Sequence, residues 1–155
     1  VFTPGARPIT RKGGRIAFGT DDAYIWATPG FSTVRETQLM RETGLHSLEV
    51  LKAATRTSAL TLGEPKLGLV RPGHLADLLI VDGNPAANLK FLYAFGDLVR
   101  GADGTVRRTR GIVHTIKDGI VTDNAKIMQA VEQLVREAKA SQPMDVAREP
   151  WVAKP

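Results

Sequence analysis

The first stretch with a clear hydrophobic pattern is residues 15–19, Arg-Ile-Ala-Phe-Gly, which follow a start rich in glycine and proline. A short apolar run without alternation is typical of a parallel strand that is buried on both faces. The polar residues Thr20, Asp21 and Asp22 end this run. We therefore expect a buried strand over residues 15–19, followed after a few residues by a loop over residues 27–31.

Two helices are expected next. Thr33 and Glu36 have the spacing of a capping box, which places the start of the first helix there, and Gly44 follows its C-terminal end. Ser47 is expected to be the N-cap of the second helix, which ends at Gly63. Seven residues follow the helical spacing of this second helix, and four of them are small: Leu48, Leu51, Ala54, Thr55, Ser58, Ala59 and Leu62. Small side chains along one stripe imply close packing against another element.

Beyond residue 65 the pattern becomes typical of β-structure. Residues 76–81 are almost continuously apolar and predict a buried strand, and residues 82–85, Asp-Gly-Asn-Pro, predict a turn after it. Residues 87–93 are expected to form a short helix, and residues 96–110 an irregular loop rich in glycine and arginine.

The last elements are a hairpin and a helix. Residues 112–116 alternate between apolar and polar positions, and Asp118-Gly119 followed by Ile120-Val121 completes a hairpin. An amphipathic helix is then indicated by apolar residues on one face: Ile127, Val131, Leu134, Val135 and Ala138. The tail from Ser141 is expected to be loose.

This order of elements leaves the first strand without a partner. A single buried strand that leads into a helix cannot form a parallel sheet alone, and no other stretch of the sequence offers it a neighbour. We therefore expect that part of the domain precedes Val1. The chain begins without a methionine and shows no signal-peptide pattern, so the sequence does not indicate a localisation.

The amino-acid composition excludes several classes of functional site. The chain has 155 residues, of which 43% are hydrophobic and 24% charged, as in ordinary globular domains. Because it contains no cysteine, disulfides, thiolate metal sites and a cysteine nucleophile are excluded. No apolar run approaches the roughly 20 residues that a membrane-spanning helix needs, so we expect no membrane partner.

The net charge of +5 leaves a binding function open. Arg107, Arg108 and Arg110 form a basic cluster, and a non-enzymatic basic binding module that uses them is the alternative to an enzyme. Nucleic acid is disfavoured because no aromatic residues are interleaved with these arginines. A steep salt dependence of nucleic-acid binding would support this alternative.

Candidate chemistry is concentrated in Gly19-Thr20-Asp21. A carboxylate just past the C-terminal end of a buried parallel strand is where α/β barrels place catalytic groups. Its oxygens can ligate a divalent cation or accept a proton from water. The simpler alternative is a turn at the end of the strand, in which Asp21 or Asp22 bonds to local N–H groups.

Other catalytic motifs are missing from the sequence. His46, His74 and His114 do not have the spacing of a helical two-histidine metal site. The nucleophile motif G-x-S-x-G, the phosphate-binding loop G-x-x-x-x-G-K-[ST] and the dinucleotide fingerprint G-x-G-x-x-G are also absent from the sequence.

Four segments, taken together and in order, resemble one family. Residues 14–21, Gly-Arg-Ile-Ala-Phe-Gly-Thr-Asp, resemble the eighth barrel strand of the amidohydrolase superfamily, and residues 47–63 resemble the helix that follows it. Residues 67–85, with Pro-Gly-His-Leu-Ala-Asp at their centre, and residues 113–121 resemble its later β-segments. The resemblance covers residues 14–123, and imidazolonepropionase-like and Xaa-Pro dipeptidase-like members are the most similar.

The resemblance implies a fold class of α/β plus β. Residues 1–65 would be the C-terminal end of a (β/α)8 metal-dependent hydrolase barrel. Residues 66–123 would be part of a small composite β-sandwich, and residues 124–155 a C-terminal helix and tail. The barrel of such a protein carries one or two divalent metal ions, with Zn²⁺ expected here.

The resemblance also implies a function. The parent protein would hydrolyse carbon–nitrogen bonds of non-peptide or dipeptide-like amides. Asp21 would contact the metal and accept a proton from the metal-activated water. An in-family alternative is an aminohydrolase that acts on a ring amidine. Asp22 and Tyr24 would lie in the loop at the barrel mouth, where plain loop packing is the favoured expectation.

The other metal ligands of the family have no counterpart here. This implies that the chain is the C-terminal portion of a larger protein, that the fragment alone is inactive, and that its main partner is the missing N-terminal part. The substrate is expected to be a small molecule. The sequence leaves open whether the protein forms a homo-oligomer.

Overall fold

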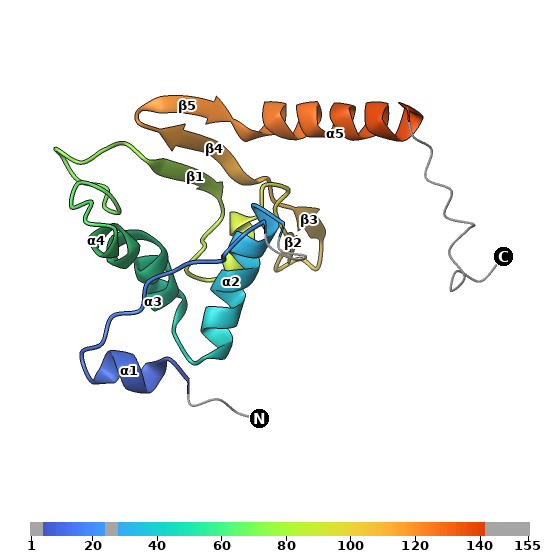
Figure 1. Cartoon of the computed structure of the whole chain (residues 1–155). Helices are drawn as coiled ribbons and strands as arrows, with labels where there is room; N and C mark the ends of the chain where they lie inside the picture. The colour runs from blue at the N-terminus through green and yellow to red at the C-terminus, as the bar shows by residue number, and fades with distance from the viewer. Residues whose placement is uncertain (1–4, 24–27, 142–155) are drawn as a thin grey trace, which may run out of the picture. The chain divides into compact units, whose positions relative to one another are not determined.

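The computed structural model describes residues 5–23 and 28–141 (Figure 1). The chain separates into two compact units, residues 1–124 and residues 125–155. The elements of the first unit, in chain order, are α1 (Arg7–Arg11), α2 (Phe31–Glu42), α3 (Ser47–Lys52), the π-helical turn η1 (Ala53–Thr57), α4 (Ser58–Thr61), β1 (Leu78–Asp82), the 3₁₀ helix η2 (Leu89–Leu92), β2 (Leu98–Arg100), β3 (Val106–Arg108), β4 (Gly111–Lys117) and β5 (Ile120–Asp123).

The hydrophobic core lies between the helices α2 and α3 and the 3₁₀ helix η2, which follows β1. Val50 of α3 is completely buried, and it packs in one cluster with Met40 of α2 and Leu89 of η2. Other members of the cluster or residues packed against it are Leu45, Ala53, Ala6, Ile16, Phe18, Leu51 and Leu92. Because Leu89 comes from the β-rich part of the chain, this core joins the helical segment to the segment that follows it.

The helix boundaries differ by one or two residues from those expected. Helix α2 begins at Phe31 after Gly30, so the capping box expected at Thr33 is wrong. The Thr33 hydroxyl instead points to Asp22, with its oxygen 3.5 Å from the carboxylate. In α3 the N-cap is His46 rather than Ser47, since the His46 N–H donates to the Glu49 carboxylate at 2.7 Å.

The segments α3, η1 and α4 follow one another directly and form one continuous helix that ends at Thr61. Gly63 follows its end with φ +78°, a conformation that glycine adopts without strain, as expected for a helix stop. Within the stripe of small residues, Ala59 is buried at 5% exposure and Leu62 is 75% exposed. Only part of the stripe is therefore covered by the described residues.

The prediction of a strand over residues 15–19 is wrong, because the structure has no strand there. This segment has no ladder partner among the described residues, although Ile16 and Phe18 are partly buried against the core cluster. A strand requires a neighbouring strand for its backbone N–H and C=O groups. The segment thus keeps its apolar contacts without the hydrogen-bonded sheet that the sequence pattern predicts.

The β-strands form two antiparallel sheets. The larger sheet has the order β1-β4-β5, and its hairpin turns at Asp118 and Gly119, as expected. Both turn residues have positive φ, +51° and +81°, which is the conformation of a tight turn whose twist matches that of the strands.

A β-bulge interrupts the pairing of β1 with β4. Ile80 pairs with His114 and Val81 with Ile112, so Val113 is the extra residue on β4. The expectation that residues 76–81 form a strand is confirmed over Leu78–Asp82. The expectation that this strand is buried is wrong, because Leu79 is 50% and Ile80 47% exposed. No described element covers that part of the sheet.

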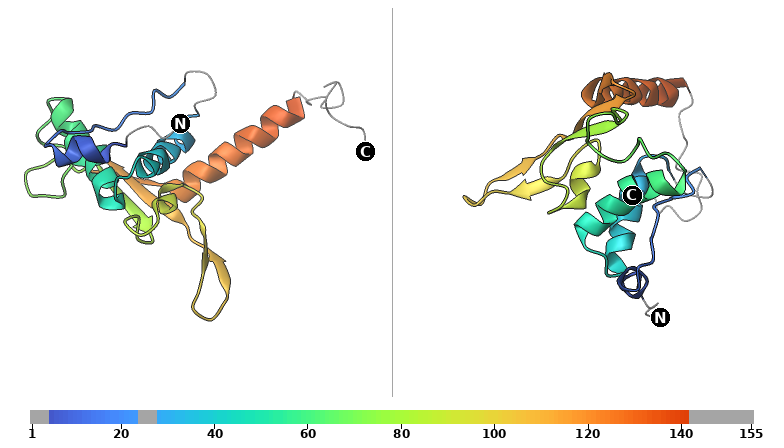
Figure 2. Two further views of the ribbon diagram at one scale, coloured as in Figure 1. Left: turned by 90° about the horizontal axis from the view of Figure 1, so that it is seen from below. Right: turned by 90° about the vertical axis from the view of Figure 1, so that its left-hand side faces the viewer.

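Residues 96–110 are not the irregular loop that was expected. They contain the hairpin β2–β3, which extends away from the helices of this unit in Figure 2. Asp97 and Thr109 join its base, where the Thr109 N–H donates to Asp97 O at 2.9 Å and the Asp97 N–H donates to the Thr109 hydroxyl at 3.0 Å. The sequence did not reveal this hairpin, because its strands have only three residues each and the segment is rich in glycine and arginine.

The second unit contains α5 (Asn124–Ser141), whose first residue belongs to the first unit. The amphipathic helix expected here is confirmed as a helix. Its apolar residues Ile127, Val131, Leu134 and Val135 are between 45% and 64% exposed. None of the helices in the described part of the chain is both long and apolar enough to cross a membrane.

Candidate active site

Asp21 lies at the end of the extended segment that begins at Arg15. Its side chain is exposed, and among the described residues its carboxylate has no hydrogen-bonding or ion-pair partner. Asp21 has φ +50° and Ala23 has φ +73°, and these are two of the three described non-glycine residues with positive φ. Aspartate adopts this conformation readily, whereas for Ala23 it is strained, and strained backbone is often found at functional sites.

Asp22 is placed differently from Asp21. It is partly buried, one of its oxygens lies 3.5 Å from the Thr33 hydroxyl, and the other is buried without a hydrogen bond. The two neighbouring carboxylates therefore face different surroundings, one solvent and the other helix α2. Tyr24, the other loop residue considered from the sequence, lies outside the described residues.

Ser58 holds the segment that leads to Asp21. The Phe18 N–H donates to Ser58 Oγ at 3.0 Å, and the Ser58 hydroxyl donates to Ala53 O at 2.8 Å. Sequence reasoning placed Ser58 only among the small residues of the helix stripe. Its partner Phe18 is 40 positions away in the sequence, so helical spacing alone does not reveal the contact.

The histidines are not brought together as a metal site. His46 caps α3 and lies 2.8 Å from the Arg7 guanidinium, whereas His114 lies on β4. Within residues 5–23 and 28–141 there is no group of three or more His, Asp or Glu side chains able to hold a metal ion. Asp21 alone does not fit a metal ion, since a catalytic zinc site takes about three protein ligands.

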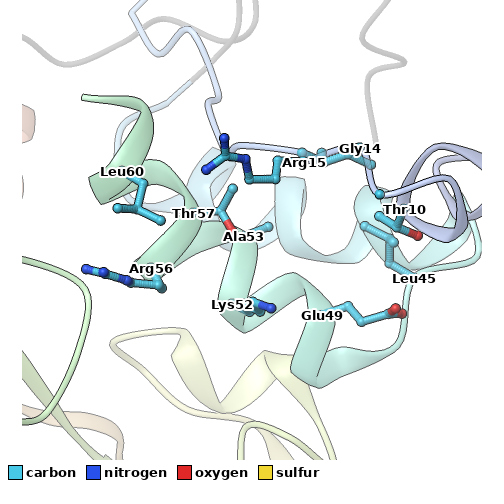
Figure 3. Close-up of a pocket in the computed structure, with 12 residues that line it drawn as sticks. Thr10, Gly14, Arg15, Leu45, Glu49, Lys52, Ala53, Arg56, Thr57 and Leu60 are labelled. Atoms are coloured by element: carbon cyan, nitrogen blue, oxygen red, sulfur yellow. The ribbon is translucent and has the colours of Figure 1, made fainter. Parts of the chain in front are cut away.

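A cavity of about 450 Å³ opens beside the helix, but not at Asp21 (Figure 3). Its walls are the segment before Ile16 and one face of α3, η1 and α4. Figure 3 shows Arg15, Lys52 and Arg56 spread around the cavity rather than converging on one point. Arg56 is also used locally, because its guanidinium donates to Pro65 O at 3.0 Å. The cavity therefore does not present a focused binding site.

The three arginines of the alternative function are also dispersed. Arg107 and Arg108 are adjacent on β3, so their side chains leave opposite faces of the hairpin. Arg110 is engaged with Asp82: its N–H donates to the carboxylate at 2.9 Å, and its Nε lies 3.7 Å from the same oxygen. The hydrogen bond from the Arg110 N–H is the main reason that the pKa of Asp82 is lowered.

The comparison with known families decides the classification. The profile of the amidohydrolase family matches residues 2–121. This chain belongs to the amidohydrolase family. The match includes Asp21, the helix α3–η1–α4, the strands β1 and β4, and the first two residues of β5.

Individual amidohydrolase relatives agree with this assignment. The ochratoxinase of Aspergillus niger is 37% identical over 83 residues, which are 52% of this chain and 16% of that enzyme. A crystal structure of an Xaa-Pro dipeptidase with methionine bound in its active site superimposes with a TM-score of 0.57 at 29% identity, over 76% of this chain and 24% of that one. A structure of an uncharacterised protein, at 21% identity, has the same fold with a TM-score of 0.53 over 74% of this chain and 24% of that one. The chain thus spans about a quarter or less of these relatives.

Proposed function

We propose that this amidohydrolase chain is the C-terminal portion of a metal-dependent hydrolase that cleaves carbon–nitrogen bonds of dipeptide-like or non-peptide amides. Two named relatives support the reaction class, since one is called an ochratoxinase and the other an Xaa-Pro dipeptidase. A divalent metal ion, expected to be Zn²⁺, would supply Lewis-acid chemistry in the completed protein. Its remaining ligands would come from outside the described residues, which do not form a metal site by themselves.

The observation that carries the proposal is the placement of the Asp21 carboxylate. It is exposed and unpartnered among the described residues, on a segment whose preceding side chains are packed in the core. A carboxylate held in this way keeps its oxygens available for a ligand and for a proton. We assign Asp21 the acceptance of a proton from the attacking water, a role typically worth about 10²–10⁴-fold in rate.

The test uses the completed protein, that is, this chain together with the part of the protein that supplies the remaining metal ligands. Hydrolysis of an amide panel, made of Xaa-Pro dipeptides and N-acyl amino acids, is measured after dialysis against Zn²⁺. Asp21→Asn is expected to lower kcat by at least about 10³-fold and to leave the fold in place, because the amide keeps the size but cannot accept the proton.

Asp22→Asn is the matched control, since the Asp22 carboxylate faces α2 and the Thr33 hydroxyl. Its kcat is expected to stay within a few-fold of that of the unmodified protein. Equal effects of the two substitutions, or an Asp21→Asn protein that keeps most of its rate, would show that Asp21 is an ordinary turn residue.

A further inference from the structure

We propose that Ser58 is a positioning residue for the reaction: its hydroxyl anchors the Phe18 backbone to the helix and thereby fixes the location of Asp21. This inference rests on the proposed function of Asp21. The anchor itself is a property of the described chain, whatever the reaction.

The hydrogen bonds of Ser58 define the direction of its hydroxyl group. A serine hydroxyl has one proton to donate and lone pairs with which to accept. The proton is given to Ala53 O at 2.8 Å, whereas Phe18 O lies farther away, at 3.5 Å. The lone pairs are then free to accept the Phe18 N–H at 3.0 Å. Both functions of the hydroxyl are therefore used within the protein.

The π-helical turn η1 explains why Ser58 faces the extended segment. The Ser58 N–H bonds to Ala53 O, five residues back, instead of to the residue four back as in an α-helix. Such a turn inserts one residue and rotates the residues after it by about 100° relative to a regular α-helix. Because single π-turns inside helices are frequent at functional sites, this local irregularity is itself a sign of a positional requirement.

Ser58 supplies the only described side-chain hydrogen bond to the segment between Arg15 and Asp21. The apolar side chains of Ile16 and Phe18 fix the depth of the segment against the core. They do not fix its position along the strand direction, because apolar contact is not directional. A hydrogen bond to the Phe18 N–H is directional and sets that position.

The distance from the anchor to the carboxylate gives the expected size of the effect. Asp21 follows Phe18 by three residues, about 10 Å of extended chain. Loss of the anchor frees the backbone at Phe18, and a misplacement of about 1 Å at a reacting group costs roughly 10²-fold in rate. Ser58→Ala is therefore expected to lower kcat by about 10- to 100-fold with KM within about two-fold.

The experiment compares four variants of the completed protein on the same amide panel. Ser58→Thr keeps the hydroxyl and is expected to retain most of the kcat that Ser58→Ala loses. Thr55→Ala is the matched control, because the Thr55 hydroxyl also bonds within this helix, to Leu51 O at 2.7 Å, but does not reach Phe18. Where Ser58→Ala gives no soluble protein, Ser58→Cys replaces it, since a thiol is a weak acceptor of similar size.

A second measurement separates failure of the anchor from failure of the proposed function. Hydrogen exchange at the Phe18 amide is expected to accelerate at least about ten-fold in Ser58→Ala and to stay unchanged in Thr55→Ala. Unchanged exchange in Ser58→Ala overturns the anchor, whether or not the protein is a hydrolase. If Asp21→Asn is inactive while Ser58→Ala keeps full kcat, the proposed function stands and the positioning role is wrong. If no amide of the panel is hydrolysed, the positioning role falls with the proposed function, and exchange still decides the anchor.

Discussion

Asp77 accepts the backbone N–H of Asp118 at 2.7 Å, although 41 positions separate the two residues in the sequence. The other oxygen of Asp77 pairs with Lys117 Nζ at 2.5 Å, and the Gly119 N–H donates to Ala76 O at 3.1 Å. These contacts fasten the turn between β4 and β5 to the residues just before β1. The hydrogen bond from Lys117 is the largest reason that the pKa of Asp77 is lowered, and the same contact raises the pKa of Lys117.

Asp77→Asn is expected to loosen this turn. The amide removes the negative charge that Lys117 and the Asp118 N–H stabilise, and hydrogen bonds to charged groups are the stronger ones. Hydrogen exchange at the Asp118 and Gly119 amides should become several-fold faster. Asp103→Asn serves as the control, because the Asp103 carboxylate accepts the N–H and the hydroxyl of Thr105, two residues away, so the substitution should change exchange in its own turn.

The same contact predicts a pH dependence. A group whose pKa is lower in the folded state contributes stability above its unfolded-state pKa and loses it as the pH falls through the folded-state value. The difference in amide hydrogen-exchange rate between the unmodified chain and Asp77→Asn should therefore have its full size at pH 6–7. It should shrink below about pH 4, the ordinary range of aspartate. A difference that stays constant down to pH 2 would contradict the assignment.

Gly96→Ala is expected to disrupt the base of the β2–β3 hairpin. Gly96 has φ +68°, and a Cβ on it would overlap the backbone oxygen of Thr109, a residue whose N–H donates to Asp97 O. Gly73→Ala is the control, because Gly73 has φ +81° and open space around the added atom, so it costs only the backbone strain of about 1–2 kcal/mol. Exchange measured over residues 93–112 should rise strongly for Gly96→Ala alone.

The chain of residues 1–155 by itself is expected to bind Zn²⁺ weakly and to have no amidase activity. The described residues offer no group of three His, Asp or Glu side chains, and one carboxylate supplies too few ligands. Titration calorimetry with Zn²⁺ should show no sub-micromolar site. Dipeptide turnover by the purified chain would contradict both parts of this prediction.

The isolated chain is also expected to self-associate. Several large apolar side chains of the first unit are exposed: Leu62 at 75%, Val70 at 88%, Leu79 at 50%, Ile80 at 47% and Ile120 at 72%. Extended apolar patches and unpaired strand edges promote association. Light scattering after size-exclusion chromatography should give a mass above 16.8 kDa that rises with concentration. A monomer that melts cooperatively would argue against the view that this chain is part of a larger protein.

The β4–β5 turn is a case in which a local signal predicted the local structure correctly, whereas the local signals for the helix starts at Thr33 and Ser47 were wrong by one or two residues. Asp118-Gly119 between two apolar runs specified the β4–β5 hairpin, because both residues tolerate the positive φ that its turn needs. The strand expected over residues 15–19 was wrong since a strand depends on neighbours that the described chain does not provide. The bond between Ser58 and Phe18 was not predictable for a related reason: it joins residues far apart in sequence and depends on a π-turn that no residue pattern specifies.

The bulge at Val113 determines where β4 can become one residue shorter without a change in the rest of its pairing with β1. On one side of the bulge, the paired residues of β1 and β4 run from Leu78–Ile116 to Ile80–His114. On the other side they run from Val81–Ile112 to Asp82–Gly111. Removal of Val113 would make these two sets continuous without moving any residue to a new partner. A deletion elsewhere in β4 would shift one set by a residue and turn its side chains to the opposite face. Val113 is therefore the point in β4 where one-residue length variation is compatible with an unchanged sheet.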